Sequence, residues 1–224
     1  FMPFRYLRED ELARRLVMNL RLPRILAACL LGAGLSGAGM VLQMIFRNPL
    51  VSPGFLGVSQ GAGFGAAIAI IFMGSASLWV EGLAVFFAFL ALGMSYYLAE
   101  RIRFGDWALR LVLAGIAISA FFSSGLGVLK YMADPQQQLP NIVFWLLGAL
   151  WGVTWAELLR ALPITIISLV VLYLMRWRLN LLSMRDESAF SLGASLGWER
   201  TVILTAAVAA TAATVAMAGI VGWV

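Results

Sequence analysis

Long apolar runs without a charged residue alternate along this chain with short segments that carry Arg, Lys, Asp or Glu. A helix of about 20 apolar residues crosses the hydrocarbon core of a bilayer, so each such run predicts a membrane span. The runs are continuously apolar, whereas the strands of a membrane barrel alternate apolar and polar residues. The sequence therefore predicts an all-α, polytopic helical membrane protein. The six predicted spans are residues 25–46, 54–74, 82–99, 111–129, 161–175 and 201–224.

Residues 139–156 form a seventh apolar run, and the distribution of positive charge indicates whether this run crosses the membrane. Cytoplasmic loops of membrane proteins carry an excess of Lys and Arg. If this run does not cross, eight arginines share one face, and between the spans only Lys130 and Arg160 lie on the other. We therefore predict a short helix that dips into the outer face. The eight arginines are Arg47, Arg101, Arg103, Arg110, Arg176, Arg178, Arg185 and Arg200.

The segment before residue 25 adds further arginines to the predicted outer face and opposes this bias. Acidic residues stand among the first four of them, which favours a folded surface helix over a topology-setting loop. The residues concerned are Arg5, Arg8, Glu9, Asp10, Glu11, Arg14 and Arg15.

Composition supports the membrane assignment and excludes several kinds of site. Hydrophobic residues make up 62% and charged residues 12% of the chain, with a mean hydropathy of +0.92, whereas soluble domains are about 25% charged. The net charge of +5 is explained by arginines that flank the spans, so no nucleic-acid partner is expected. With Cys29 as the single cysteine and no histidine, the chain has neither an intrachain disulfide nor a Cys/His metal site.

Small and polar residues mark the first two predicted spans. Gly32, Gly34, Gly37 and Gly39 lie in the first span and predict a face that packs closely against another helix. The second span begins with a polar, glycine-rich patch at residues 57–63. A patch of that kind at membrane depth needs a protein partner or water.

A series of spaced motifs resembles the permease subunits of ABC importers for iron-siderophores, vitamin B12 and haem, the FecCD-like family. The resemblance covers nearly the whole chain after the first 20 residues. The motifs are Arg21-Leu22-Pro23-Arg24, Gln43, Arg47-Asn48-Pro49-Leu50, Pro53-Gly54, Leu56-Gly57-Val58-Ser59, Gly61-Ala62, Leu113-Ala114-Gly115-Ile116-Ala117, Phe144-Trp145-Leu146-Leu147-Gly148, Arg178-Leu179-Asn180-Leu181-Leu182, Ser188-Ala189 and Leu192-Gly193.

The resemblance implies a type II ABC importer permease fold of ten helices, of which residues 1–224 form one transmembrane domain that is incomplete at both ends. One helix is expected before Phe1 and about three after Val224. It further implies a permease dimer in a prokaryotic inner membrane, with ABC ATPase subunits and an extracytoplasmic substrate-binding protein. ATP and Mg would be bound by the ATPase, since this chain has no GxxxxGK[ST] motif and is expected to bind no cofactor or metal.

Residues 179–199 form the longest polar stretch between two predicted spans. Ser183 with Asp186 is a plausible capping pair and Gly193 suits a helix end, so we predict a short helix over 186–192 and a second turn closed by Gly197. A plain surface loop is the alternative. In the resembled family this loop couples the permease to the ATPase, which would assign that role to Arg185, Asp186, Glu187, Ser188, Ala189, Leu192 and Gly193.

Uncharged polar residues in the spans are the candidates for a translocation pathway, although an interhelical hydrogen bond is the alternative for each. They are Gln43, Ser59, Gln60, Ser119, Ser123, Ser124 and Asn141. The resemblance places Gln60 at the inner gate. By position alone, it also places the turn that holds Phe104 and Asp106 at a second gate.

Three functions are compared on these grounds. An ATP-driven importer of a metal chelate leads, with ferric siderophore as first cargo and haem, cobalamin or molybdate behind it. An ion-coupled secondary carrier would be expected to hold an acid inside a span, yet Glu81, Glu100, Asp106, Asp134 and Glu157 all fall at or near predicted ends. A membrane enzyme acting on lipid would need a nucleophile and base, which the spans do not offer.

Overall fold

The computed structural model describes residues 11–221, and every regular element within that range is a helix or helical turn. The apolar runs of the sequence form these helices because a helix satisfies its own backbone hydrogen bonds inside a membrane. In chain order the elements are α1 (Glu11–Leu16), a π-helical turn (Val17–Arg21), α2 (Leu22–Phe46), the 3₁₀ turn η3 (Pro53–Leu56), α3 (Val58–Phe72), α4 (Ser77–Arg101), α5 (Trp107–Met132), α6 (Gln138–Leu147), α7 (Trp155–Leu174), α8 (Arg176–Leu182), α9 (Asp186–Ser191) and α10 (Leu196–Ala218).

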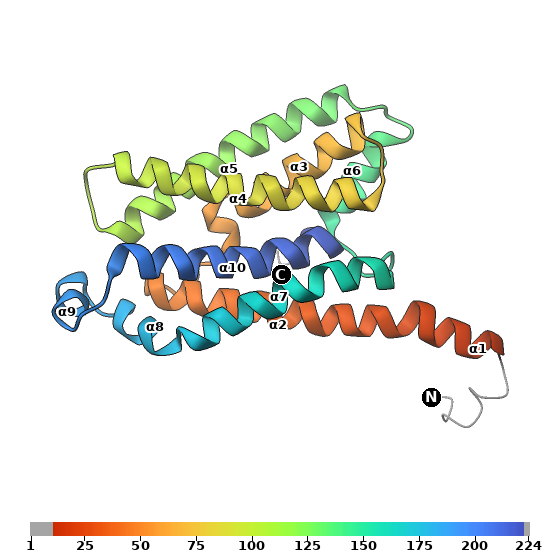
Figure 1. The fold of residues 1–224 in the computed structure, drawn as a ribbon. Coiled ribbons are helices and arrows are strands. Elements are labelled where there is room, and N and C mark those ends of the chain that lie inside the picture. Colours follow the sequence, from red (N-terminus) through yellow and green to blue (C-terminus); the bar gives the residue numbers. More distant parts are fainter. Residues whose placement is uncertain (1–10, 222–224) are drawn as a thin grey trace.

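Helix α10 is the core of the bundle. It packs against α7 and α2 on one side and against α4 on the other, and Figure 1 shows it running between these two groups of helices. The most apolar part of α10 is 78% buried, against 28% for α4. Its alanines permit this close packing, because helices in lipid associate through small residues.

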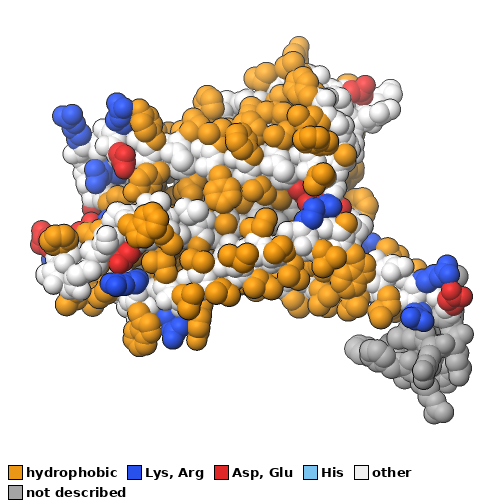
Figure 2. Space-filling view, in the orientation of Figure 1, with side chains coloured by type: hydrophobic (Ala, Val, Ile, Leu, Met, Phe, Trp, Pro, Cys, Tyr) orange, Lys and Arg blue, Asp and Glu red, His pale blue; other side chains and the backbone are white. Residues whose placement is uncertain are grey.

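Within residues 11–221, five helices are long and apolar enough to cross a membrane, and two shorter apolar helices accompany them. Hydrophobic side chains cover the middle of the bundle and most charged side chains lie at its two ends (Figure 2). Helix α6 has 10 residues, so the prediction that the run 139–156 does not cross is confirmed. The predicted span 201–224 is shorter as a helix, because α10 ends at Ala218; residues 222–224 lie outside the described residues.

The predicted span 54–74 is only partly helical. Helix α3 has 15 residues, or about 22 Å at 1.5 Å per residue, and it begins near the middle of the bundle (Figure 1). The chain reaches it through η3 and through Gly57, whose φ of 80° is a left-handed conformation suited to glycine. The prediction of a full span from residue 54 is therefore wrong at its start.

The turn η3 is held between α4 and α5. Ser95 of α4 is fully buried, and its hydroxyl donates a hydrogen bond of 3.0 Å to the carbonyl oxygen of Leu56. On α5, a Cβ placed on Gly115 would collide with the carbonyl oxygen of Phe55. Non-helical backbone is tolerated at membrane depth only where protein or water surrounds it, and these two helices supply the protein.

The predicted small face of the first span is correct at two of its four glycines. Gly34 lies against Thr214 of α10, with 3.0 Å between an ideal Cβ and the Thr214 methyl carbon, and Gly37 lies against Leu169 of α7. At Gly32 and Gly39 a Cβ would meet no atom within 4 Å. The predicted face also included Ala33, Ser36 and Ala38, of which Ala38 is fully buried, so part of this face is a helix contact.

Loops that the distribution of arginines assigned to the same face of the membrane lie at the same end of the bundle. We call one end the arginine-rich end; it holds the α4–α5 turn and the segment from α8 to the start of α10. The opposite end holds α1 and the turns that follow α3, α5 and α6 (Figure 1). The sequence predicted a folded surface helix around Glu11, Arg14 and Arg15. In the structure these residues form α1, a helix that continues through the π-helical turn into α2. Arg5, Arg8, Glu9 and Asp10 lie outside the described residues.

Candidate functional site

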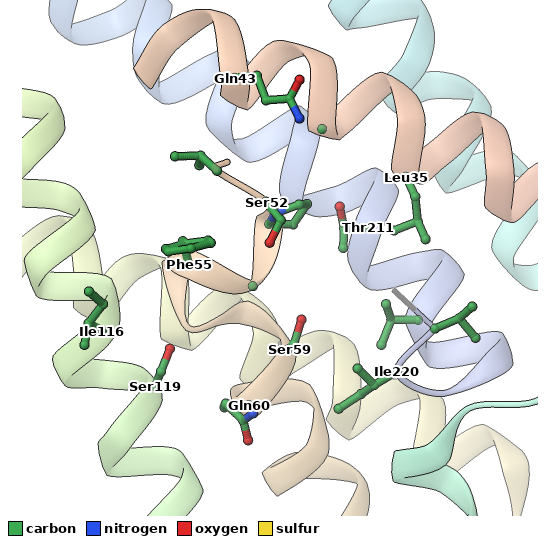
Figure 3. A pocket seen from close by; sticks show the side chains of 16 residues that line it. Leu35, Gln43, Ser52, Phe55, Ser59, Gln60, Ile116, Ser119, Thr211 and Ile220 are labelled. Atoms are coloured by element: carbon green, nitrogen blue, oxygen red, sulfur yellow. The ribbon is translucent and has the colours of Figure 1, made fainter. Parts of the chain in front are cut away.

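An open cavity of about 610 Å³ lies between α2, η3, α3, α5 and α10 (Figure 3), and some of its lining side chains, among them Gln43 and Ile116, are exposed. Its size falls within the range of small-molecule sites, roughly 300–1,000 Å³. The cavity exists because α3 starts late, so that the extended segment before η3 replaces a helix at this depth. The lining residues are Leu35, Gly39, Gln43, Val51, Ser52, Pro53, Gly54, Phe55, Ser59, Gln60, Ile116, Ser119, Thr211, Val215, Ile220 and Val221.

Four of the predicted pathway residues line this cavity. Gln43 comes from α2, Ser59 and Gln60 from the first turn of α3, and Ser119 from α5. Figure 3 shows these side chains spread around the cavity rather than gathered at one point. The lining residues include no Asp, Glu, Lys or Arg. Such a surface offers hydrogen bonds without a fixed charge, and it holds no acidic or basic side chain that could activate its serine hydroxyls.

The other predicted pathway residues do not line this cavity. Ser124 bonds within its own helix to the carbonyl oxygen of Ala120 at 2.8 Å. The side-chain amide of Asn141 donates to the Ser75 hydroxyl at 3.1 Å, near the opposite end. Ser123 is exposed on α5.

Phe104 and Asp106 lie in the α4–α5 turn at the arginine-rich end, away from the cavity lining. The Asp106 carboxylate accepts a hydrogen bond of 2.9 Å from the Leu109 amide and so caps α5. The Phe104 side chain is exposed. A gating role for this turn stays a prediction.

Several cavity residues were not among the pathway candidates taken from the sequence. Thr211 of α10 is buried and bonds to the carbonyl oxygen of Ala207, while Ile116 and Ile220 are apolar. A threonine inside an apolar run is a weak signal, since its hydroxyl usually bonds within its own helix. The apolar members give no sequence signal at all.

The predicted coupling segment forms two short helices, α8 and α9. Helix α9 spans Asp186–Ser191, close to the predicted 186–192, and Gly193 follows its C-cap with a φ of 82°. Two details differ. The Ser183 hydroxyl bonds to the Asn180 carbonyl oxygen instead of capping α9, and Gly197 lies within the first turn of α10 rather than closing a separate turn. The Ser183 hydroxyl is taken by the last turn of α8, and Gly197 is helical because α10 already begins at Leu196.

Ala189 anchors α9, whereas its other side is exposed. Ala189 is fully buried, while Phe190 is 73% and Leu192 59% exposed. Arg185 and Glu187 are also exposed. Large apolar side chains beside charges, on a polar end of the molecule, are typical of a protein contact surface.

Charged contacts tie this segment to α10. Arg200 donates to Asp186 with an Nη2–Oδ1 distance of 2.6 Å, and Arg178 lies 3.4 Å from Glu199. The guanidinium carbon of Arg200 also lies 4.2 Å from the ring centre of Trp107, at the start of α5. A buried arginine needs such partners.

A second cavity, of about 330 Å³, lies at the opposite end and is bordered by an ion pair between α4 and α7. Arg160 donates to both carboxylate oxygens of Glu81, at 2.7 and 2.8 Å, and the Ser77 hydroxyl donates to the same carboxylate at 3.0 Å. Glu157 accepts from Thr154 in a capping box at the start of α7. Among residues 11–221, no group of three or more His, Cys, Asp or Glu side chains is placed to hold a metal ion.

These features define a class: a multi-pass helical membrane protein with an uncharged, open cavity between its helices and a helical segment presented at one polar end. The profile of the FecCD transport family matches residues 2–224. The chain belongs to the FecCD transport family. The match includes the first 20 residues, which the motif comparison had left out.

Individual relatives agree with the family. The chain is 39% identical over 221 residues to a probable iron chelatin transport system permease protein of Helicobacter pylori, covering 98% of this chain and 66% of that protein. It is 36% identical over 215 residues to the molybdate import system permease protein MolB of Haemophilus influenzae, covering 96% and 63%. The chain thus spans about two thirds of the length of these relatives.

A solved structure supports the fold. An inward-facing conformation of a metal-chelate type ABC transporter superimposes with a TM-score of 0.89 at 35% sequence identity. The superposition covers 96% of this chain and 68% of the other. The expected permease fold is therefore confirmed for the described residues.

Proposed function

We propose that this chain is the transmembrane permease part of an ATP-driven ABC importer that carries a metal chelate into the cytoplasm, with a ferric siderophore as its cargo. The observation that carries this proposal is the family match over residues 2–224. The choice of cargo is supported by the Helicobacter pylori relative, which is named for iron chelatin transport. Haem, cobalamin and molybdate are the competing cargoes. A relative named for molybdate import supports molybdate as one of these alternatives.

The uncharged cavity suits such a cargo. A chelate is bulky and carries many oxygen atoms, and it must leave as readily as it enters. Gln43, Ser59, Gln60 and Ser119 offer hydrogen bonds, each of which contributes only about 1 kcal/mol. We propose that these side chains contact the cargo during passage, with Gln60 at the inner gate and the turn of Phe104 and Asp106 at a second one.

The α8–α9 segment is proposed to dock on the ATPase. Its exposed Phe190 and Leu192 lie beside Arg185 and Glu187 at the arginine-rich end, which positive charge assigns to the cytoplasm. Ser188 and Gly193 complete the segment, and Ala189 fixes it to the bundle. We propose further that two permease chains assemble with two ATPase subunits and that a substrate-binding protein docks at the opposite end.

Reconstitution tests this proposal. The full-length protein would be placed in liposomes with the ATPase and binding protein encoded beside it, and ATP hydrolysis and uptake would be measured with a panel of ferric siderophores, haem, cobalamin and molybdate. We expect one ferric siderophore to stimulate hydrolysis and to be taken up only with ATP. Uptake of another panel member would correct the cargo. Uptake driven by an ion gradient without ATP would establish the alternative, a secondary carrier.

A matched pair of variants tests the docking segment in the same assay. Glu187→Arg reverses a charge on exposed α9, and Gln136→Arg introduces the same side chain into an exposed turn at the opposite end. We expect Glu187→Arg to lose ATPase binding and uptake and Gln136→Arg to keep ATPase binding. Normal uptake in the Glu187→Arg protein would refute docking through α9.

A further inference from the structure

Arg200 joins three helices at the arginine-rich end. It lies on the first turn of α10, and its side chain is only 9% exposed. One guanidinium nitrogen donates to Asp186 of α9 at 2.6 Å. The guanidinium carbon lies 4.2 Å from the ring centre of Trp107, the first residue of α5. The same side chain therefore contacts both the exposed segment and a membrane-spanning helix.

Trp107 extends this contact to a fourth helix. Its ring stacks on Phe46, the last residue of α2, with ring centres 5.9 Å apart and an interplanar angle of 21°. Asp186, Arg200, Trp107 and Phe46 thus form a continuous series of contacts, which we call the Arg200 relay. Continuous packed contacts between rigid helices are one physical route by which displacement at one site reaches another.

The chemistry of the relay requires arginine. A guanidinium group is planar, so it can stack on an indole face while its edge donates to a carboxylate. A charge-assisted bond to Asp186 fixes the side chain in that orientation. A lysine ammonium at this position would keep the charge but could not hold both contacts with one rigid group.

We propose that Arg200 is a positioning residue that transmits displacement of α9 to the first turn of α5 and the end of α2. This inference rests on the proposed function, because α9 is displaced only if the ATPase docks on it. The relay gives α5, which lines the 610 Å³ cavity, a direct connection to that docking segment.

A second ion pair in the same region provides a matched control. Arg178 of α8 lies 3.4 Å from Glu199, the residue beside Arg200, and its side chain is 50% exposed. This pair also joins the docking segment to α10. Within the described part of the chain, the Arg178–Glu199 pair makes no ion pair or ring contact with Trp107 or another residue of α5, so it lies outside the Arg200 relay.

The test follows two reporter positions in the full-length protein assembled with its ATPase in liposomes. In a background with Cys29→Ser, one cysteine is introduced at Ser191 on α9 or at Leu109 on the first turn of α5, both of which are exposed. Each is labelled with an environment-sensitive fluorophore. The fluorescence change on adding ATP with vanadate is then measured for the unaltered relay and for Arg200→Gln, Arg200→Lys, Trp107→Leu and Arg178→Gln.

We expect both reporters to respond when the relay is intact. In Arg200→Gln and Trp107→Leu the Ser191 reporter keeps its response, whereas the Leu109 response falls about fivefold or more, the lower end of typical coupling between sites. Arg200→Lys gives an intermediate Leu109 response, and Arg178→Gln leaves both responses unchanged. Trp107→Leu keeps Arg200 and its bond to Asp186, so the relay is tested without removing the buried charge.

Two other outcomes would contradict the inference in different ways. If the Leu109 response survives in Arg200→Gln and Trp107→Leu, or falls equally in Arg178→Gln, the relay is wrong while docking through α9 stands. If the Ser191 reporter shows no response with an intact relay, docking through α9 fails and the relay fails with it.

Discussion

The Ser95 hydroxyl on α4 holds the carbonyl oxygen of Leu56 at 3.0 Å, across 39 residues of chain. Leu56 ends η3, the 3₁₀ turn that leads into α3. A buried carbonyl without a partner costs about 1–3 kcal/mol, so we expect Ser95→Ala to lower the free energy of unfolding by that amount. Thermal unfolding in detergent measures it. Ser124→Ala is the control, because its hydroxyl bonds only within its own exposed helix turn; an equal loss there would contradict the prediction.

Glycine on α5 is required where the helix meets η3. A Cβ on Gly115 would collide with the Phe55 carbonyl oxygen, whereas a Cβ on Gly127 of the same helix meets nothing within 4 Å. We expect Gly115→Ala to destabilise the protein by about 1–3 kcal/mol, the usual cost of overpacking. Gly127→Ala should leave stability unchanged or slightly higher, since alanine favours helix. Size-exclusion profiles and unfolding temperatures of the two variants decide the matter.

The Arg160–Glu81 pair links α7 to α4 beside the second cavity. Removing one partner of a fully buried pair costs about 3–5 kcal/mol. Because Arg160 is 36% exposed and Glu81 14%, we expect a smaller loss of about 1–3 kcal/mol for Glu81→Ala. Replacing both residues by methionine should cost less than the single change.

The exposed Arg15–Glu11 pair serves as the control for that measurement. Its side chains are 73% and 78% exposed, so Arg15→Ala should not change the unfolding temperature measurably. If Glu81→Ala also left the unfolding temperature unchanged, the ion pair between α4 and α7 would have no stabilising role.

Cysteine labelling in intact cells tests the orientation. With Cys29→Ser as background, we expect a reagent that does not cross membranes to label Gln136→Cys at the opposite end and to miss Phe104→Cys at the arginine-rich end. Cys29 itself lies within the apolar helix α2, which we expect to lie in the hydrocarbon core where such a reagent does not enter, so the natural protein should stay unlabelled. Labelling of Phe104→Cys from outside would show that the orientation is the reverse of the one predicted.

The sequence predicted the spans well because continuous apolar runs and flanking arginines report directly on the membrane. The same charges correctly placed α6 as a helix that does not cross. The end of α10 was not predictable in this way, because apolar sequence continues past it. It ends where Gly219, with a φ of 77°, lies against the backbone of Trp145 and Gly148 at the end of α6.

The cavity was only partly predictable for a similar reason. Gln43 and Ser119 could be singled out as polar residues in apolar runs, but only helix rotation decides that Ser119 lines the cavity and Ser124 does not. The contact of Arg200 with Trp107 joins segments far apart in the chain. Neither residue type nor spacing reports such a contact.

The shortness of α3 has a consequence for biogenesis. The 15 residues of α3 measure about 22 Å, which is too short for a hydrocarbon layer of about 30 Å. We therefore expect α3 to insert poorly from the translocon into lipid on its own. Only residues 73–76 separate α3 from α4, and the glycines at 61 and 65 allow close contact with α4. The two helices are therefore best delivered to the bilayer together, as one helical hairpin.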